Sequence, residues 1–402
     1  MKKILSLLFI AVLTLAGCSD DSSGELSGKI TVGIFGNPTE IATYTEISDN
    51  FTAETGVEVE LKQYTDFTTE IQAELIGGTA PDVFYVDSYV YPFFSEQGVL
   101  EPVDESMYDI SEYNQNLLNA FTTDGQLYAL PKDYSTLAIY YNKKFVNAED
   151  LPTAYEDLRP YLETLQKSLP EGVAPMTVNI DLARQLYLAE SSGATVIDPE
   201  TGLANFNQKE VVDGLSTEYE LAKDKLMVSP ADYGFGWNGE IFGSEKTALM
   251  LEGNWVKGEL DNNYSDVDYG VVENFTTNGK KGSMLFTVGW GVNAASENKL
   301  AAQTFVQYLS NAENVEKAST QNGTLPARDD VAETMGLVSD EIYGPHVASA
   351  EYARVWQAGN SLSTINTEYM NYMLSVVKGE RTLEEALAEV DKQANAIIEA
   401  NQ

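Results

Sequence analysis

The sequence predicts an α/β fold made of two units, each with strands and helices in alternation around a mostly parallel sheet. Three observations support this prediction. Short apolar or alternating runs of strand length precede stretches with helical spacing, glycines stand where those helices would end, and the same order returns in the second half. A chain of 402 residues exceeds the usual size of one domain, so two or three domains are expected.

In the first unit, strands and helices follow one another closely. Residues 29–35 alternate as a strand does, and residues 41–51 then show helical spacing up to Gly56, a residue suited to a helix C-cap. The other strands are predicted at 57–64 and 82–86, and the other helices at 66–75 and 89–97. This order is typical of βαβ units.

The second unit repeats the pattern. It begins with a predicted strand at 137–141. Helices are predicted at 154–169, 182–191, 210–226 and 300–309. The last helix opens with a capping box, in which Thr382 and Glu385 would satisfy each other's backbone N–H groups.

The N-terminus predicts export and a lipid anchor. Two lysines precede an apolar run at 4–15, which is too short to span a membrane and suits a signal peptide at 1–17. The ending Leu15-Ala16-Gly17-Cys18 resembles the bacterial lipobox, which implies cleavage before Cys18 and lipidation of its sulfur. The alternative is that Cys18, the only cysteine, is an incidental thiol. Residues 18–28 are mostly polar and predict a flexible tether.

The charge of the chain excludes some partners. With 24 basic and 62 acidic side chains the net charge is -38, which repels nucleic acid and anionic lipid headgroups. It also argues against phosphate-bearing or carboxylate ligands. Most of the acids are expected to form a solvated shell that keeps the protein soluble.

The scarcity of histidine restricts catalysis. His346 is the only histidine, which argues against a Ser-His-Asp or Cys-His site and excludes a histidine-rich metal site. His346 follows a Gly-Pro pair and is expected in a loop. Neither a metal nor a cofactor is expected.

Five short segments in the chain carry a family resemblance. They are GGTAPDV at 77–83, LYALP at 127–131 with YYNK at 140–143, FGSEKTALM at 242–250 with GNW at 253–255, GWGVNAAS at 289–296, and GTLPAR at 323–328. In this order they resemble the extracellular solute-binding proteins of carbohydrate ABC importers, the family of the maltose-binding protein. The third segment departs from the family pattern, since the usual glycine is either replaced by Glu245 or shifted to Gly243.

The resemblance implies a two-lobed periplasmic-binding-protein (type II) fold with three crossovers between the lobes and a ligand cleft. The crossovers are expected near 130–136, 290–293 and 324–328. Lobe one is then 29–134 plus 292–326, and lobe two is 135–291 plus 327–402. The lobes would close on the solute by hinge bending, and the permease subunits of the transporter would recognise the closed form. A monomer, lipid-anchored at the extracellular face of the membrane, is expected.

Sugar binding calls for aromatic rings that stack on C–H faces and for polar groups that bond hydroxyls. The chain has 4 Trp and 23 Tyr. Trp255 and Trp290 are candidates by their place in the family pattern, with core packing as the alternative for Trp255. Trp356 lies where the resemblance implies a stacking aromatic, and Trp237 lies in a glycine-rich loop, both with core packing as the alternative. The polar candidates follow predicted strands or lie at crossovers, and they are Asn37, Asp87, Ser88, Asp133, Tyr134 and Arg328. For Ser88 the alternative is a helix N-cap, and for Arg328 it is a hinge salt bridge.

The hypothesis that follows is capture of a neutral sugar, with an oligosaccharide expected, and its delivery to an ABC transporter. A polyamine or other cation is the rival ligand, because acids and aromatic rings together also suit an ammonium group. An extracellular glycosidase with a carboxylate pair is the rival from another class. No enzymatic activity is expected.

Overall fold

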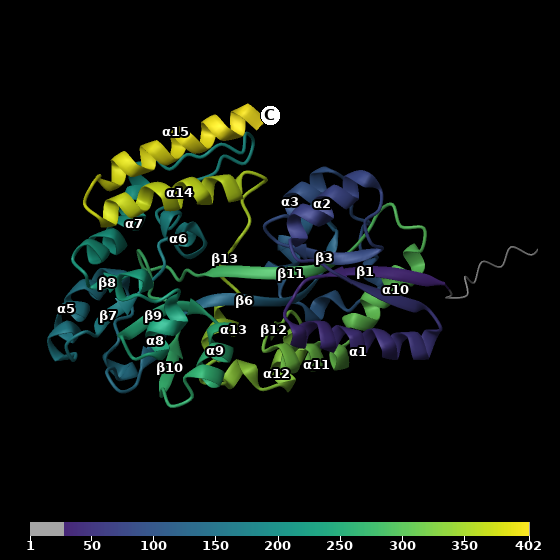
Figure 1. Ribbon diagram of the computed structural model, residues 1–402, viewed down its shortest axis with the longest axis horizontal. Helices are drawn as coiled ribbons and strands as arrows, with labels where there is room; N and C mark the ends of the chain where they lie inside the picture. Colours follow the sequence, from purple (N-terminus) through teal and green to yellow (C-terminus); the bar gives the residue numbers. More distant parts are fainter. Residues whose placement is uncertain (1–27, 402) are drawn as a thin grey trace, which may run out of the picture.

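The computed structural model describes residues 28–401, which form two halves lying side by side and joined by long strands (Figure 1). The predicted signal peptide at 1–17, the predicted lipidation site Cys18 and most of the predicted tether lie outside the described residues. Within residues 28–401, no helix has both the length and the apolar character needed to cross a membrane.

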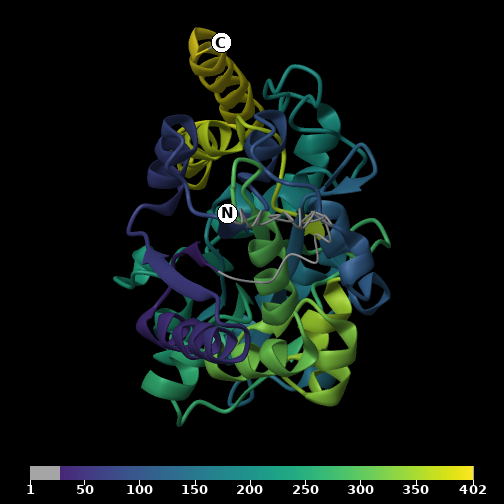
Figure 2. The ribbon, with the colours of Figure 1, turned by 90° about the vertical axis from the view of Figure 1, so that its right-hand side faces the viewer.

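The first part of the chain builds the half at the right of Figure 1. Its elements are β1 (Lys29–Ile34), α1 (Pro38–Thr55), β2 (Glu58–Gln63), α2 (Phe67–Gly77), β3 (Val83–Asp87), α3 (Tyr91–Glu96), α4 (Gln115–Ala120), β4 (Thr122–Thr123) and β5 (Gln126–Leu127). The helices α2 and α3 lie above the strands and α1 lies below them in two perpendicular views (Figures 1 and 2).

The long strand β6 (Ala129–Asn142) then leads into the other half. The elements there are α5 (Leu158–Ser168), β7 (Ala174–Thr177), α6 (Leu182–Ala189), α7 (Lys209–Lys223), β8 (Met227–Val228), α8 (Asn238–Gly243), β9 (Thr247–Gly253), α9 (Val256–Asn263) and β10 (Tyr269–Val272). A second long strand, β11 (Met284–Val292), returns to the first half.

The remaining elements are divided between the halves. Those packed on the first half are α10 (Lys299–Leu309), α11 (Ala312–Asn322), β12 (Leu325–Pro326), α12 (Asp329–Thr334) and α13 (Gly344–Ser349). The chain then passes through β13 (Arg354–Val355) to α14 (Leu362–Val377) and α15 (Leu383–Asn401), which lie over the other half (Figure 1).

One sheet runs through both halves. Its main strand order is β2-β1-β3-β11-β6-β9-β7-β8. β1 pairs in parallel with β2 and β3, and β7 pairs in parallel with β8 and β9, whereas β6 and β11 are antiparallel to their neighbours in this order. Off this order, β13 pairs in parallel with β11. The α/β alternation predicted from the sequence is therefore confirmed.

Two separate hydrophobic cores define two lobes. The first core contains Val32, Phe84 and Phe121, and we call the half built around it lobe one. The second contains Leu186, Leu249 and other buried side chains, and it defines lobe two. β6 passes from one core to the other between Tyr134 and Leu137, and β11 does so between Leu285 and Met284.

The third connection follows α13. Ala327, Leu337 and Ala353 are buried in the core of lobe one, and Leu362 is the first residue after them that is buried in the core of lobe two. The sequence-based ranges put residues from 327 onward in lobe two. In the structure β12 pairs with β6, and the helices that follow it stay against lobe one.

Two local predictions differ from the structure. The predicted strand at 137–141 is part of the longer β6, which accommodates Pro131 beside a β-bulge, where a missing N–H costs least. The prediction that His346 lies in a loop is wrong, because the short helix α13 begins at Gly344 with Pro345 in its first turn, and His346 is fully buried on it.

Candidate ligand-binding site

Three neighbouring strands carry the chain between the lobes. At the crossing β6 and β11 are paired, with Thr136 opposite Leu285. β13 pairs with the other edge of β11, so that Arg354 lies opposite Met284 and Val355 lies opposite Leu285. The three connections therefore lie side by side, which is the arrangement needed for the lobes to bend as two bodies about one line.

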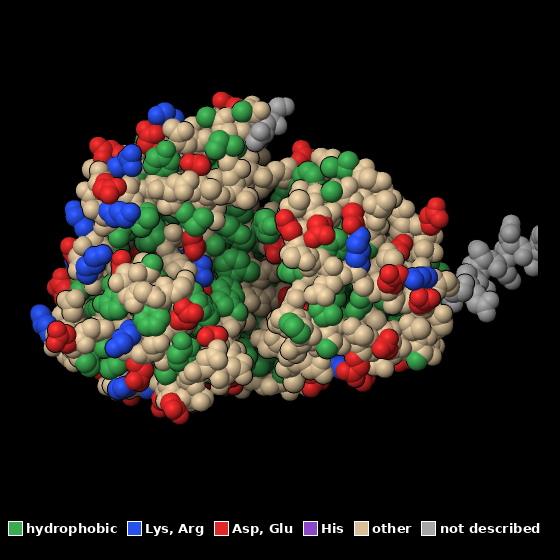
Figure 3. Space-filling model, viewed as in Figure 1, with side chains coloured by type: hydrophobic (Ala, Val, Ile, Leu, Met, Phe, Trp, Pro, Cys, Tyr) green, Lys and Arg blue, Asp and Glu red, His purple; other side chains and the backbone are tan. Residues whose placement is uncertain are grey.

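A groove lies between the lobes on the outside of the molecule. The space-filling view shows it as a hollow, with hydrophobic side chains along the wall formed by lobe two (Figure 3). A concave surface between two lobes is a common place for a small-molecule site.

Partly exposed and buried residues alternate along the central strands near the crossing. Asp87 on β3 and Asp133 on β6 both lie opposite Val288 of β11, one on each side, and Phe286 lies opposite Ser135. All five side chains are partly exposed, whereas their neighbours in the strands, such as Thr287 and Tyr134, are buried. Residues opposite one another in a sheet share a face, so these five form one strip, which we call the central strip.

A β-bulge places a cation beside the strip. The pairing of β6 with β11 shifts between Val288 and Gly289, which leaves Lys132 as the extra residue in β6. Because of the bulge, the side chains of Lys132 and Asp133 meet, with Lys132 Nζ 2.5 Å from Asp133 Oδ2. Bulges are frequent next to binding sites because they redirect a side chain in this way.

Lys132 is the centre of a buried charged cluster. Its Nζ lies 3.1 Å from Glu40 Oε1 and 4.6 Å from the centre of the Tyr85 ring, and Tyr85 donates its hydroxyl to the same Glu40 oxygen at 2.7 Å. Burial opposes the charge of Lys132, but the carboxylates of Asp133 and Glu40 outweigh it and hold the pKa of Lys132 above its ordinary value. The ammonium group thus fixes two carboxylates at the edge of the strip.

Asp87 differs from the other carboxylates of the site because no cation contacts it directly. It ends β3 and accepts a hydrogen bond from the backbone N–H of Tyr89 at 3.1 Å. Burial raises the pKa of Asp87 to about 6, with the Asp133 charge acting in the same direction. A hydroxyl donor on a ligand would supply the hydrogen bond that this carboxylate lacks.

Two tryptophan rings join Phe286 of the central strip on the side of lobe two. The rings of Trp255 and Phe286 meet edge to face with centroids 5.6 Å apart, and the Trp356 ring lies 6.4 Å from Phe286. Trp255 is 39% exposed, and the other two are partly exposed. Large aromatic rings left open to solvent beside polar groups form a surface that fits the apolar face of a sugar.

Buried polar groups hold Trp255 in this position. Glu252 is fully buried and accepts two hydrogen bonds from Arg184, at 2.8 and 3.1 Å, and one from Asn238. Asn254 accepts a hydrogen bond from the backbone N–H of Thr136 on β6. Both ends of the turn before Trp255 are thereby fixed, one to lobe two and the other to the crossing strand.

Hydrogen bonds to lobe one hold Trp356 in place. Its backbone N–H donates to Leu285 of β11, and its carbonyl accepts a bond from the hydroxyl of Ser88 at 3.3 Å. Gln357 donates to the carbonyls of Ser88 and Ala120, both at 2.8 Å. Ser88 is therefore buried and bonds the protein rather than presenting its hydroxyl to the groove.

The other candidates from the sequence serve structural roles. Trp290 is 2% exposed and packs against Tyr44 and Tyr85, because α1 covers that end of the sheet face. Tyr134 is buried in the core of lobe one on the opposite face from the strip. Trp237 is partly exposed and packs against a small core of lobe two, over Gly239, where even a Cβ atom would come within 2.4 Å of its ring.

The two remaining candidates are occupied by local hydrogen bonds. Asn37 caps α1, with its side-chain oxygen accepting from the N–H groups of Thr39 and Glu40. Arg328 forms a two-point ion pair with Asp330 at 2.9 and 2.7 Å and lies over the Tyr113 ring. Of the ten candidates, the structure thus brings together Asp87, Asp133, Trp255 and Trp356 beside the groove.

Sequence reasoning missed several members of the site. They are Glu40, Lys132, Ser135, Phe286, Val288 and Gln357. The alternation along β11 is visible in the sequence and places Phe286 and Val288 on one face and Thr287 on the other. No sequence signal indicates that α1 covers Trp290 but leaves Phe286 and Val288 uncovered.

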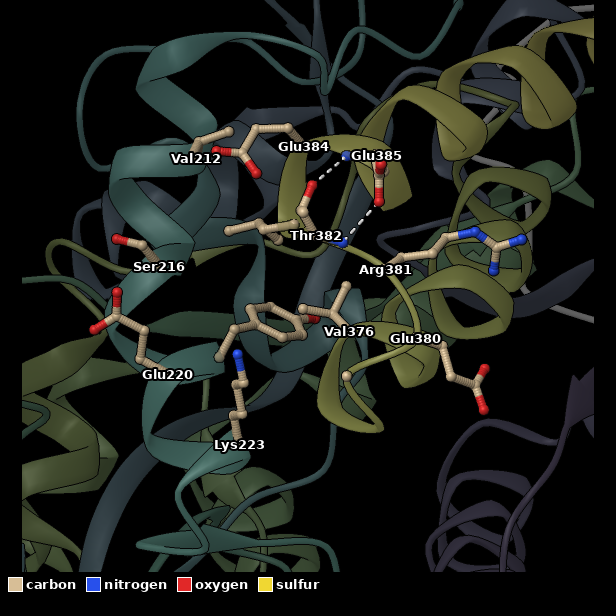
Figure 4. Close-up of a pocket in the computed structure, with 13 residues that line it drawn as sticks. Val212, Ser216, Glu220, Lys223, Val376, Glu380, Arg381, Thr382, Glu384 and Glu385 are labelled. Carbon is tan, nitrogen blue, oxygen red and sulfur yellow. Dashed lines mark hydrogen bonds between the residues drawn. The ribbon is translucent and has the colours of Figure 1, made fainter.

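A second hollow belongs to lobe two alone. It lies between α7 and the turn from α14 to α15, and its walls carry Glu220, Lys223 and Glu380 (Figure 4). In this turn the predicted capping box is confirmed: Thr382 N donates to Glu385 Oε2, and Glu385 N donates to Thr382 Oγ1, at 3.0 and 3.2 Å (Figure 4). Because lobe one contributes nothing here, hinge closure would not complete this hollow as a site.

The fold and the groove define a class of protein. Two α/β lobes joined by three adjacent strands, with aromatic and acidic groups at the junction, form a binding protein that encloses a small solute between its lobes. Among residues 28–401 no group of three or more His, Cys, Asp or Glu side chains is placed to hold a metal ion.

The chain belongs to the family of bacterial extracellular solute-binding proteins, whose model matches residues 36–316. The family predicted from the motifs is confirmed. A maltotriose-binding protein of Pyrococcus abyssi is 25% identical over 332 residues, which are 79% of this chain and 71% of the relative. A galactooligosaccharide-binding protein of Bacillus subtilis is 22% identical over 358 residues, or 86% of this chain and 83% of that protein.

Solved structures confirm the two-lobed fold. A sugar-binding protein of Xanthomonas citri superposes with a TM-score of 0.83 at 17% identity, covering 93% of this chain and 98% of that one. A substrate-binding protein of Listeria monocytogenes in complex with cycloalternan has a TM-score of 0.78 at 21% identity, with coverage of 92% and 99%. The family is one of binding proteins, so the chain is assigned to binding and not to catalysis.

Proposed function

We propose that this protein captures a neutral oligosaccharide outside the cell and delivers it to the permease of an ABC transporter. The observation that carries the proposal is the row of rings formed by Trp255, Phe286 and Trp356 beside the carboxylates of Asp87 and Asp133. Rings and charge-assisted acceptors together match the apolar faces and hydroxyl rim of a sugar. Relatives that bind maltotriose and galactooligosaccharides support the substrate class.

The binding step uses the crossing strands as a hinge. Lobe one contributes the carboxylates of the central strip, and lobe two contributes Trp255. Closing the lobes would bring the two sets of groups onto opposite sides of one ligand and remove water from between them. Each group alone binds weakly, so a stable complex requires the closed form.

The experiment is a thermal-shift screen of the purified protein against neutral mono- and oligosaccharides and against polyamines. A ligand at a hundred times its Kd adds about 2.7 kcal/mol to the free energy of unfolding, which raises the melting temperature measurably. X-ray scattering of the same complex would show a smaller radius of gyration if the lobes close. A shift with a polyamine and none with any sugar would overturn the proposed ligand class.

The proposal includes attachment to the outer face of the cell membrane through Cys18 and a monomeric protein. The lipobox-like ending at Cys18 supports the anchor, since two or more acyl chains hold a protein stably on a bilayer. Metabolic labelling with a fatty-acid analogue should mark the wild type and leave Cys18→Ser unlabelled. A single species at monomer mass in light scattering would support the oligomeric state.

A further inference from the structure

The core of lobe two contains a buried carboxyl group that the proposed binding function does not use. Glu218 lies on α7 and is 1% exposed. Its Oε2 accepts a hydrogen bond from Gln185 Nε2 at 2.9 Å, whereas its Oε1 has no hydrogen-bond partner among residues 28–401. A carboxylate that is buried with a single hydrogen bond bears a large desolvation cost, so this position favours the protonated form.

Three helices meet at this carboxyl group. Gln185 comes from α6, Tyr219 follows Glu218 on α7, and Tyr369 comes from α14. The hydroxyls of Tyr369 and Tyr219 donate to Gln185 Oε1 at 3.0 and 3.2 Å, which fixes the amide so that its N–H side faces Glu218. We call these four residues the helix junction. All four are buried, and their hydrogen bonds connect α6, α7 and α14.

The groups around the helix junction favour the neutral form of Glu218. The negative charge of Asp181, just before α6, opposes ionisation of Glu218. Arg184 on α6 is bound to Asp181 and to Glu252. Burial raises the pKa of each tyrosine near Glu218 above its ordinary value, and these are Tyr155, Tyr187, Tyr219 and Tyr369. The other elements packed on α7, β8 and α15, place apolar side chains in this core, Met227 and Leu387 among them.

The protonation of Glu218 changes in the physiological pH range. Burial raises the pKa of Glu218 to about 7, and the hydrogen bond from Gln185 opposes this shift only in part. In the unfolded chain the ordinary pKa is 4.5, so the folded protein holds this proton more tightly. The resulting stabilisation is complete below pH 4.5 and is lost as the pH rises through 7.

A hollow on the surface of lobe two reaches the helix junction. Tyr219 lines the hollow between α7 and the turn from α14 to α15 (Figure 4), which has a volume of about 440 Å³. This space is large enough for several water molecules. Tyr219 contacts both the hollow and Gln185, so a small displacement of this ring would let water reach Glu218.

We propose that the helix junction is a proton-dependent switch in lobe two. With Glu218 as a neutral acid, α6, α7 and α14 pack tightly around it. With Glu218 as a carboxylate, water enters from the hollow at Tyr219 and the three helices loosen. This device is independent of the proposed sugar site, since all four residues of the junction lie inside lobe two.

Urea unfolding of the wild type and of Glu218→Gln from pH 5 to 8 tests the proposal. The amide side chain keeps an acceptor and cannot ionise. The unfolding equilibrium constant of the wild type, divided by that of the variant, should rise by up to about tenfold per pH unit until pH 7 and then level off. Hydrogen exchange measured by mass spectrometry at pH 8 should be faster in α6 and α7 of the wild type than in the variant.

The matched control is Glu220→Gln, two residues further along α7, where the side chain is 68% exposed. It should keep the pH dependence of the wild type. Parallel curves for the wild type and Glu218→Gln would overturn the switch, as would equal hydrogen exchange at pH 8. Loss of sugar binding in any of these proteins has no bearing on it.

A measurement on the wild type covers the case in which Glu218→Gln does not fold. Carbon-13 NMR of protein labelled at the glutamate Cδ should show one carboxyl resonance that titrates with a midpoint near pH 7. If every glutamate resonance had finished titrating by pH 6, Glu218 would be ionised in the folded protein at neutral pH, and the proposal would be wrong.

Discussion

At the scale of single residues, the same side chain serves a core or a binding surface according to what covers it. Trp255 and Trp290 both follow glycine-rich turns or strands and both match the family pattern in the sequence. α1 lies over Trp290 through Tyr44, whereas Trp255 packs on Gly253 and the Phe286 ring and remains 39% exposed. The exposed ring is the one with free surface for a ligand.

This difference predicts opposite effects for the two tryptophans. Trp255→Ala should lower oligosaccharide affinity at least tenfold, about 1.4 kcal/mol, because a stacking surface is lost. Its free energy of unfolding should fall by less than the 3–5 kcal/mol that is roughly the cost of truncating a fully buried tryptophan, since Trp255 is 39% exposed. Titration calorimetry and urea unfolding measure the two quantities.

Trp290→Phe is the matched control. It removes part of a buried ring and should cost about 2 kcal/mol of stability with oligosaccharide affinity unchanged. If Trp290→Phe weakened binding and Trp255→Ala did not, the assignment of the aromatic surface would be wrong.

At the scale of elements, the crossing strands are held by a buried histidine on α13. His346 Nδ1 lies 2.8 Å from the carbonyl oxygen of Thr136, and Nε2 lies 2.8 Å from the hydroxyl of Tyr140. Both partners are on β6, Thr136 within the crossing between the lobes and Tyr140 after it in lobe two. α13 thus attaches the third connection to the first at the hinge.

The buried ring makes stability depend on pH. Burial lowers the pKa of His346 to about 4, whereas the pKa of the same side chain in the unfolded protein is near 6.5. Because its pKa is lower in the folded protein, His346 stabilises the fold at pH values above about 6.5. This stabilisation is lost as the pH falls from 6.5 toward 4. The loss amounts to about 3 kcal/mol at most.

The test is to measure the free energy of unfolding in urea for the wild type and for His346→Gln at several pH values from 7 to 4. The variant keeps a donor and an acceptor, and all carboxylates titrate equally in both proteins. The stability difference between them should therefore shrink as the pH falls. Parallel curves would show that His346 does not carry this dependence.

At the scale of the whole molecule, negative charge opposes compactness. The chain has 62 acidic against 24 basic side chains, and a net charge of -38 repels itself. Most ion pairs, such as Lys209 with Asp213, are exposed and contribute little each. The repulsion is long-ranged at low salt, where the screening length is about 30 Å at 0.01 M.

Salt should therefore stabilise this protein. Raising NaCl from 0.01 M to 1 M shortens the screening length to about 3 Å and should raise the melting temperature by a few degrees. Differential scanning calorimetry measures the change, and KCl at the same ionic strength should give the same result. A melting temperature that falls with added salt would mean that ion pairs outweigh the repulsion.

The sequence by itself determined the class of the fold and the family. Strands and helices alternate with periods that do not depend on distant contacts, so β1, α1, β2 and α2 were predicted nearly as they occur. The motifs at 77–83 and 323–328 depend only on local order, and they indicated the family that the comparisons confirm. The capping box at Thr382 is local in the same way.

Only the tertiary structure decided which residues meet at the groove. Asp87, Asp133 and Val288 are far apart in the chain and become neighbours through strand pairing, and the bulge that turns Lys132 toward Asp133 has no sequence signature. Whether a tryptophan is covered depends on where α1 ends above the sheet. Local periodicity fixes the face that a side chain takes within its own strand, but the covering of that face depends on segments hundreds of residues away.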